Sequence, residues 1–252
     1  MTKKMKLADV PSGKDFEIWG HAYTVLDGDD KGIFVLEADA VCEMPFREND
    51  VDYKVAPNDF RDSSVKTYLE GYYLEDMVQA GAKLGEDILP MELDLKCTLG
   101  QHEYGVARVH AGLLTLEQYG KYYDIIPRID TTYWLATPWK TPSRSPNTSN
   151  TNYVWSVSSN GDCDFWYCSG ACGVRPALTL SPSLLVSVEC EEEEEVESKW
   201  HEYLDYLIHW VSYHSDKSFA GCMPACYNEW LDSKEECEYW TRKGEINNEK
   251  FR

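Results

Sequence analysis

A strand-forming stretch with one long polar interruption, residues 133–180, constrains the fold of this chain more than any other segment. It begins with the apolar run Tyr133–Leu135, which ends near Pro138 because proline has no amide proton to donate to a sheet. Residues 137–152 are nearly all Thr, Pro, Ser, Asn, Lys or Arg, a composition that favours a surface loop over a buried element. We therefore expect two groups of strands separated by this loop.

An aromatic hairpin is expected directly after the loop. Residues 153–157 and 164–167 have strand composition, and Asn160-Gly161 between them is a typical tight-turn pair, which predicts positive φ at both positions. A second, glycine-containing turn then leads into a last apolar strand at 174–180.

Three motifs in this stretch resemble a domain family of unknown function that is common in Gram-positive bacteria and their phages. The family's Trp-Trp-Leu-Arg-Ser-Pro strand, Val-Asn-x-x-Gly hairpin and Gly-Val-Arg-Pro-Ala-Leu strand correspond to Tyr133–Pro138, Val157–Gly161 and Gly173–Leu178, and the last match is complete. Weaker matches are found at Ala22–Leu26, Ser63–Leu69 and Leu113–Tyr119, so that the resemblance covers roughly residues 15–182. It departs at Ala136, where the family has Arg.

The resemblance implies an α+β fold similar to C-type lectins and formylglycine-generating enzymes, a scaffold of short antiparallel strands that displays a binding surface. It implies no known reaction. It also implies that residues 174–180 pair with the early strand at 23–26, and that a carboxylate or backbone carbonyls hold Arg175.

Local patterns predict the elements before and after this stretch. Alternation of apolar residues predicts strands at 16–26, 32–36, 41–46 and 184–188. A helix is expected to start after Asp62 or Ser63, and four following residues share one apolar helix face: Val65, Tyr68, Leu69 and Tyr72. Thr115 and Gln118 have the spacing of a capping box, which predicts a short helix to about residue 123.

The end of the chain differs from the rest. We expect a C-type-lectin-like domain at 1–188, an acidic linker at 189–197 containing the run Glu191–Glu195, and a helical appendage at 198–252. The appendage is predicted to be a helical hairpin. Four residues at helical spacing should be buried in intramolecular contacts: Trp200, Leu204, Leu207 and Val211.

Charge and cysteine count limit the partners and the compartment. A net charge of −20 argues against nucleic acid or anionic membrane as a direct partner and favours a basic protein. The sequence has no run of eighteen apolar residues, and its basic start lacks the apolar core of a signal peptide, so we expect a cytoplasmic protein of a bacterial host. In that compartment the nine cysteines are expected to be reduced thiols.

Motifs for catalysis or metal binding are not found. The cysteine groups 163/168/172 and 222/226/237 lack the Cys-x-x-Cys knuckle of zinc sites, and Asn147 in Ser145-Pro146-Asn147 lacks the carboxylate that calcium requires. Neither a Gly-x-Ser-x-Gly nucleophile nor a phosphate-binding glycine loop occurs. We therefore expect no enzyme activity, no cofactor and no metal ion, and a metal- or thiol-dependent enzyme is the third hypothesis.

The positive functional signal is aromatic. Trp and Tyr dominate interface hot spots, and strand alternation turns only half of these side chains inward. We expect Trp134 and Trp155 to pack beneath the loop, and Trp139 and Trp166 to face outward. The candidate binding residues are Trp139, Arg144, Asn147, Tyr153, Trp155, Asp164, Trp166 and Tyr167.

The leading hypothesis is a non-enzymatic protein-binding protein of phage or mobile-element origin, with loop 137–152 and the aromatic hairpin as its contact surface. The alternative is an acidic inhibitor, similar to anti-CRISPR proteins, that mimics nucleic acid in the binding channel of a host defence protein. Salt separates the two hypotheses, since binding by a phosphate mimic weakens steeply with salt and aromatic docking changes little.

Overall fold

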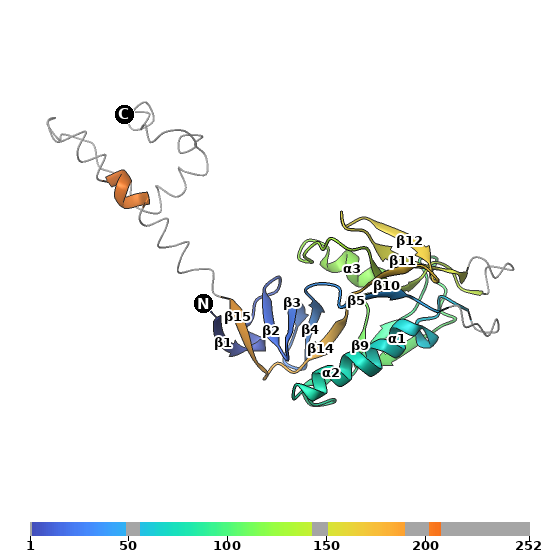
Figure 1. Cartoon of the computed structure of the whole chain (residues 1–252), viewed down its shortest axis with the longest axis horizontal. Helices are drawn as coiled ribbons and strands as arrows, with labels where there is room; N and C mark the ends of the chain where they lie inside the picture. The colour runs from blue at the N-terminus through green and yellow to red at the C-terminus, as the bar shows by residue number, and fades with distance from the viewer. Residues whose placement is uncertain (1, 49–55, 143–150, 190–201, 208–252) are drawn as a thin grey trace, which may run out of the picture. The chain divides into compact units, whose positions relative to one another are not determined.

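The structure, a computed structural model, describes residues 2–48, 56–142, 151–189 and 202–207 (Figure 1). Residues Thr2–Glu189 form one compact unit, and Cys190–Arg252 belong to a second. Within the described ranges, no helix is long and apolar enough to cross a membrane. The fold of the first unit is built on sheets.

The larger sheet, sheet A, has eight strands in the order β1-β15-β2-β3-β4-β14-β6, with β9 also paired to β14. Their bounds are β1 Thr2–Lys6, β2 Asp15–Ile18, β3 His21–Gly28, β4 Ile33–Glu37, β6 Ile88–Leu89, β9 Ala111–Gly112, β14 Ala177–Leu180 and β15 Leu185–Glu189. Its strand pairings are antiparallel. The predicted strands at 32–36 and 184–188 are confirmed within small shifts at their ends. The single strand predicted at 16–26 is wrong: this segment is the antiparallel hairpin of β2 and β3, which turns at Trp19 and Gly20, both with positive φ.

The second sheet, sheet B, has five strands in the order β12-β11-β10-β13-β5. The bounds are β5 Cys42–Pro45, β10 Tyr133–Pro138, β11 Tyr153–Val157, β12 Cys163–Tyr167 and β13 Ala171–Val174. A separate antiparallel pair joins β7 (Met91–Asp94) to β8 (Val106–Val109). The predicted hairpin and the strand that ends at Pro138 are confirmed, and β12 lies at the outer edge of its sheet.

One helical segment, residues 64–79, packs on this framework. It runs from α1 (Ser64–Tyr68) through the π-helical turn η3 (Leu69–Tyr73) into α2 (Leu74–Gln79), and the Ser63 side chain caps it by accepting from the amide of Lys66. The predicted apolar face is wrong at Tyr72, which is 75% exposed, whereas Tyr73 is buried. The π turn holds one extra residue, so the buried face moves by one position.

Two other helical elements are a 3₁₀ turn, η2 (Phe60–Asp62), and helix α3 (Leu116–Tyr122). The capping box predicted for α3 is confirmed: the Thr115 hydroxyl accepts from the amide of Gln118, and the Gln118 side chain accepts from the amide of Thr115. A further 3₁₀ turn, η1 (Leu7–Asp9), follows β1. These helical elements are all short.

The expected α+β, C-type-lectin-like class is therefore wrong. Strands hold 38% of the described residues and helices 21%, and the main sheet is a curled antiparallel half-barrel. The expectation missed five strands: β1, β6, β7, β8 and β9. Four of these strands have four residues or fewer, which is too short for a clear alternation of apolar and polar residues. The fifth, β1, has the sequence Thr-Lys-Lys-Met-Lys and is a charged edge strand without that alternation.

The pairing implied for residues 174–180 is also corrected. Val174 ends β13 in sheet B, whereas β14 pairs with β4, and β4 lies between β14 and β3 in sheet A. The two ends of the unit meet instead through β1 and β15, in the register Thr2↔Glu189 to Lys6↔Leu185.

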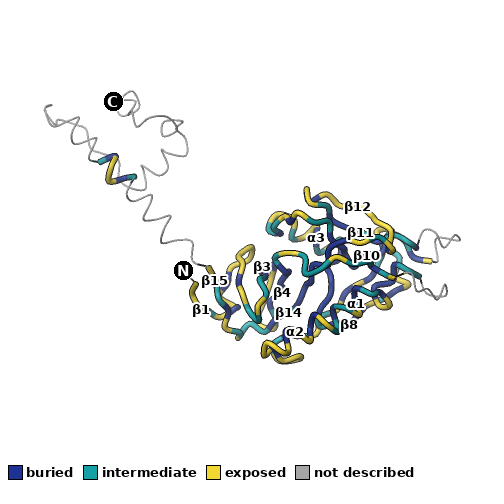
Figure 2. Tube along the Cα trace, viewed as in Figure 1, coloured by how far each residue is buried: buried dark blue, intermediate teal, exposed yellow. Residues whose placement is uncertain are grey.

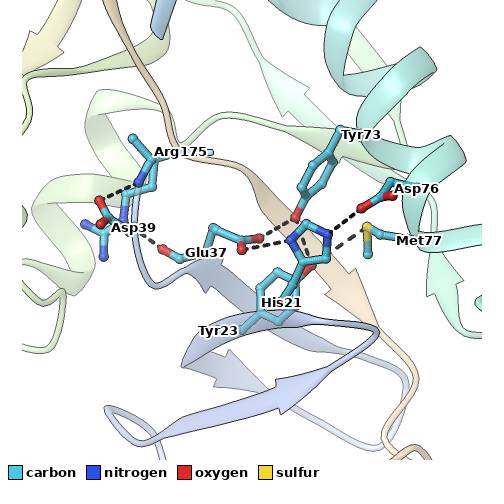
Figure 3. A network of polar contacts seen from close by, with 9 residues as sticks. His21, Tyr23, Glu37, Asp39, Tyr73, Asp76, Met77 and Arg175 are labelled. Atoms are coloured by element: carbon cyan, nitrogen blue, oxygen red, sulfur yellow. Dashed lines mark hydrogen bonds and ion pairs between the residues drawn. The ribbon is translucent and has the colours of Figure 1, made fainter. Parts of the chain in front are cut away.

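Arg175 joins the two sheets in the manner expected. Its side chain is buried, and its guanidinium donates to the backbone carbonyls of Glu37 (2.8 Å), Ala38 (2.9 Å) and Pro127 (2.9 Å). Figure 3 shows it beside the strand that carries Glu37. The guanidinium carbon also lies 5.3 Å from the centroid of the Tyr133 ring. Backbone carbonyls, rather than a carboxylate, satisfy its donors.

The C-terminal predictions are tested at only six residues. Residues 202–207 are helical, and Tyr203 and Tyr206 are buried with their rings stacked at 6.1 Å. Leu204, which was expected to be buried, is 39% exposed, so the predicted apolar face is wrong at this position. The described part of this unit contains no helical hairpin. The predicted linker after Glu189 and the residues Trp200 and Val211 lie outside the described ranges.

Candidate binding face

The β11–β12 hairpin is joined by a turn in which one glycine sets the backbone. The amide of Gly161 donates to the carbonyl of Ser158, and the amide of Ser158 donates to the carbonyl of Asp162. Gly161 has φ +86°, whereas Asn160 does not have positive φ, so the predicted pair of positive-φ residues is wrong. A type I turn followed by a glycine bulge has this pattern, and it needs positive φ only at the glycine.

The ladder register brings aromatic side chains together in pairs. Tyr153 lies opposite Tyr167, and Trp155 lies opposite Phe165. Hydrogen bonds on either side of these pairs, from Cys168 to Asn152 and from Ser158 to Asp162, identify both as the non-hydrogen-bonded positions of the ladder. Side chains approach most closely at such positions.

Five rings on this side of the hairpin form one continuous cluster, which we call the aromatic face: Trp139, Tyr153, Trp155, Phe165 and Tyr167. Trp139 contacts both Phe165 (centroids 4.2 Å apart) and Trp155 (5.1 Å). Tyr153 contacts both Tyr167 (4.4 Å) and Phe165 (5.4 Å). The rings therefore support one another and hold their positions before any partner arrives.

Much of this aromatic surface is open to solvent. Every residue of β12 is exposed (Figure 2), with Phe165 at 37% and Tyr167 at 54%, whereas Tyr153, Trp155 and Trp139 are half-buried. Large aromatic side chains grouped on an exposed sheet edge are unusual on a protein surface unless they contact something.

Trp166 lies on the other side of the strand. It pairs with Val154, and its indole covers Gly170, where an added Cβ would meet the ring nitrogen at 2.5 Å. It is 50% exposed. Trp139 and Trp166, both expected to face outward, are therefore on opposite faces of the hairpin, and Asp164 shares the face of Trp166.

A buried polar group fixes the base of the aromatic face. The Asn58 side-chain amide donates to the carbonyls of Lys140 (2.8 Å) and Tyr153 (3.0 Å), while its oxygen accepts from the Tyr104 hydroxyl (2.6 Å). The amide of Trp139 donates to the same Tyr153 carbonyl (3.1 Å). Asn58 is fully buried, so these bonds position the strand that carries Tyr153 and the start of the loop.

The free edge of β12 is partly closed by its own chain. Alternation directs the backbone groups of Cys163, Phe165 and Tyr167 away from β11. The Phe165 amide donates to the Asp164 carboxylate (2.8 Å), and the Tyr167 carbonyl accepts from the amide of Gly170 (2.9 Å). Capping of this kind disfavours the addition of another strand at the edge, so a partner is better accommodated on the ring surface.

Trp134 is fully buried, in the main core against Phe46, and donates to the carbonyl of Met44. Its expected packing beneath the loop is not tested, because residues 143–150 lie outside the described ranges. Trp155 is half-buried, and its indole nitrogen is buried without a hydrogen-bond partner. Arg144 and Asn147 lie outside the described residues. The sequence analysis did not include Phe165 or Asn58 among the site residues. Phe165 could have been found, because the hairpin register places it opposite Trp155. No local sequence signal identifies Asn58.

Four thiols of the described unit have raised pKa values. Burial raises the pKa of Cys168 and of Cys172 to about 12, and burial also raises the pKa of Cys163 and of Cys42. A raised thiol pKa lowers the fraction of nucleophilic thiolate at neutral pH. Among the residues that the structure describes, no group of three or more His, Cys, Asp or Glu could hold a metal ion.

A groove of 630 Å³ lies beside α3. Its lysines are already paired with carboxylates of the chain: Lys96 lies 2.5 Å from Glu117, and Lys121 lies 2.6 Å from Asp27. These paired charges give the groove no obvious preference for an anion or a cation. The aromatic face is therefore the stronger candidate.

Comparison with known proteins covers part of this region. Residues 115–182 match a domain of unknown function, DUF6273. The match includes α3 and all of sheet B except β5, and thus the whole aromatic face. No curated protein and no solved structure matches the chain.

Proposed function

We propose that this domain is a protein-binding module and that a basic protein partner docks on the aromatic face. The observation that carries the proposal is the cluster of five mutually contacting rings on an exposed edge hairpin. Rigid Trp and Tyr side chains bury a large area with few rotatable bonds, so they lose little conformational entropy on binding.

The charge of the chain supports the choice of partner. A protein with a net charge of −20 attracts a basic partner over a distance and repels a second copy of itself. In this arrangement the charges raise the association rate, and the rings determine how long the complex lasts. The acidic-mimic alternative assigns the affinity itself to the carboxylates.

A paired substitution separates the aromatic face from the rest of the hairpin. We expect Phe165→Ala with Tyr167→Ala to weaken binding more than a hundredfold, since central interface anchors typically contribute about 2 kcal/mol or more each. The matched control is Trp166→Ala, which removes an equally exposed ring from the opposite face and should leave affinity within about threefold. Circular dichroism confirms that each variant folds.

The measurement uses the native protein as bait on a cell extract, followed by calorimetry of each captured protein against the native domain and the two variants. Loss of binding with Trp166→Ala alone would assign the site to the other face. If neither change matters, and replacement of Glu191–Glu195 by Gln abolishes a steeply salt-dependent binding, the proposal is wrong and the acidic-mimic hypothesis holds.

A further inference from the structure

A polar network beneath α2 joins the helical segment to sheet A (Figure 3). Glu37 on β4 is buried, and its two carboxylate oxygens accept from different partners: the Tyr73 hydroxyl at 2.5 Å and His21 Nδ1 at 3.0 Å. Tyr23 lies beneath them, with its hydroxyl 2.8 Å from that of Tyr73 and 3.7 Å from the sulfur of Met77. The π turn matters here because it moves Tyr73 onto the buried face.

His21 faces a carboxylate at each ring nitrogen. While Nδ1 lies 3.0 Å from Glu37, Nε2 lies 3.4 Å from Asp76 on α2, and the Asp76 side chain is 72% exposed. An ionised carboxylate only accepts hydrogen bonds, and a neutral imidazole has only one N–H to donate. Both contacts can therefore be hydrogen bonds only when the ring carries two protons.

We propose that His21 is a pH-dependent clamp, whose doubly protonated ring fastens α2 to β3 and β4 and whose deprotonation releases α2. After deprotonation, the remaining proton stays on Nδ1, where the buried Glu37 gives the shorter contact. The exposed Asp76 then loses its donor. Besides this contact, α2 has only a few buried anchors of its own, such as Leu74 and Met77, and its C-terminal residues are exposed.

The tyrosine and cysteine side chains of this network have raised pKa values. Burial raises the pKa of Tyr73 and of Tyr23 well above 10, and it raises the pKa of Tyr68 on α1 to about 12. Cys42 of β5, which contacts Tyr68, also has a raised pKa because of burial. Glu37 and Asp76 are the carboxylates that face the ring, and histidine is the side chain whose ordinary pKa lies near neutral pH.

The direction of the effect follows from linkage. The hydrogen bond to Glu37 raises the pKa of His21 above its ordinary 6.5, although burial opposes the shift. When the pKa of a group is higher in the folded state than in the unfolded state, the group stabilises the folded state fully at pH values below its unfolded pKa. This stabilisation is lost as the pH rises through the folded-state pKa. The clamp is therefore closed below about pH 6.5 and opens above the folded pKa of His21.

Hydrogen exchange, corrected for the intrinsic pH dependence, tests the clamp between pH 5.5 and 8.5. We expect protection of the α2 amides to fall with rising pH, tenfold for each unit by which the His21 pKa, measured by NMR, is higher in the native protein than in Asp76→Asn. Amides of α3 should show no such fall and serve as an internal reference.

Three variants complete the test. His21→Gln should remove the pH dependence, and Asp76→Asn, an exposed change that leaves the core intact, should lower the His21 pKa and reduce the dependence. Glu75→Gln, one residue away on the same helix and also exposed, is the matched control and should behave as the native protein. Constant α2 protection across the range, an equal fall in His21→Gln, or identical behaviour of Asp76→Asn and Glu75→Gln would each overturn the proposal.

Discussion

The side-chain amide of Asn58 holds the backbone carbonyl of Tyr153 at 3.0 Å, across a separation of 95 residues. This contact links a buried turn before η2 to the strand that carries the aromatic face. It means that the shape of the proposed binding surface depends on a residue that no partner can touch.

Asn58→Ala should accordingly destabilise the domain by about 3 kcal/mol, because the Lys140 carbonyl and the Tyr104 hydroxyl lose this partner and the Tyr153 carbonyl keeps only the amide of Trp139. Tyr104→Phe removes only one of these hydrogen bonds and keeps the ring, so it should cost about 1 kcal/mol. Chemical denaturation measures both. Equal stability of Asn58→Ala and the native domain would show that the network does not hold the loop.

Arg175→Lys should also be strongly destabilising although the charge is kept. Lysine cannot donate to three carbonyls in the plane of a guanidinium, so buried acceptors are left unpaired at a cost on the order of 3 kcal/mol. Arg108→Ala is a suitable comparison, since Arg108 is 82% exposed and its pair with Glu92 should contribute about 0.5 kcal/mol or less. Thermal unfolding of the two variants tests the difference, and similar unfolding temperatures would contradict it.

Gly71 in the π turn allows two opposite changes at one position. A Cβ at Gly71 meets nothing within 4 Å, so Gly71→Ala should stabilise the helical segment by roughly 0.5–1 kcal/mol. Deleting Gly71 should restore α-helical register, turn Tyr73 away from Glu37 and destabilise the domain. If denaturation shows the deletion to be neutral, the π turn has no role in placing Tyr73.

Alkylation should distinguish the thiols by their burial. Cys163 is exposed and should react first with iodoacetamide, at a rate that rises with pH up to and beyond 9 because its pKa is raised. Cys168 and Cys172 are buried, with pKa values raised to about 12, and should stay unmodified until the protein unfolds. Peptide mass spectrometry at several pH values measures this order. Modification of Cys172 as fast as Cys163 in the native state would contradict it.

Local signals in the sequence predicted the elements whose cause is local. The Thr115 capping box, the Ser63 cap and the alternation in the Tyr153–Val157 strand depend on residues within a few positions of one another, and each is present in the structure. The carbonyl contacts of Arg175 were also expected, because a buried guanidinium must satisfy its donors.

Properties that depend on distant residues could not be predicted in this way. The π turn at 69–73 moves the buried face from Tyr72 to Tyr73, and the spacing of apolar residues alone favours the ordinary helical register. The charged strand β1 forms only because β15 pairs with it. The roles of Asn58 and His21 likewise come from partners far along the chain, Tyr153 and Asp76 respectively.

The pairing of β1 with β15 has a mechanical consequence. Thr2 lies opposite Glu189, so a force that separates these two residues acts on the last rung of an antiparallel ladder, across the strands rather than along them. Under such a force the backbone hydrogen bonds between β1 and β15 break one after another, from the Thr2–Glu189 pair toward the Lys6–Leu185 pair. Tension between the two ends of the domain should therefore peel β1 away at low force, while the strands that carry the aromatic face stay folded.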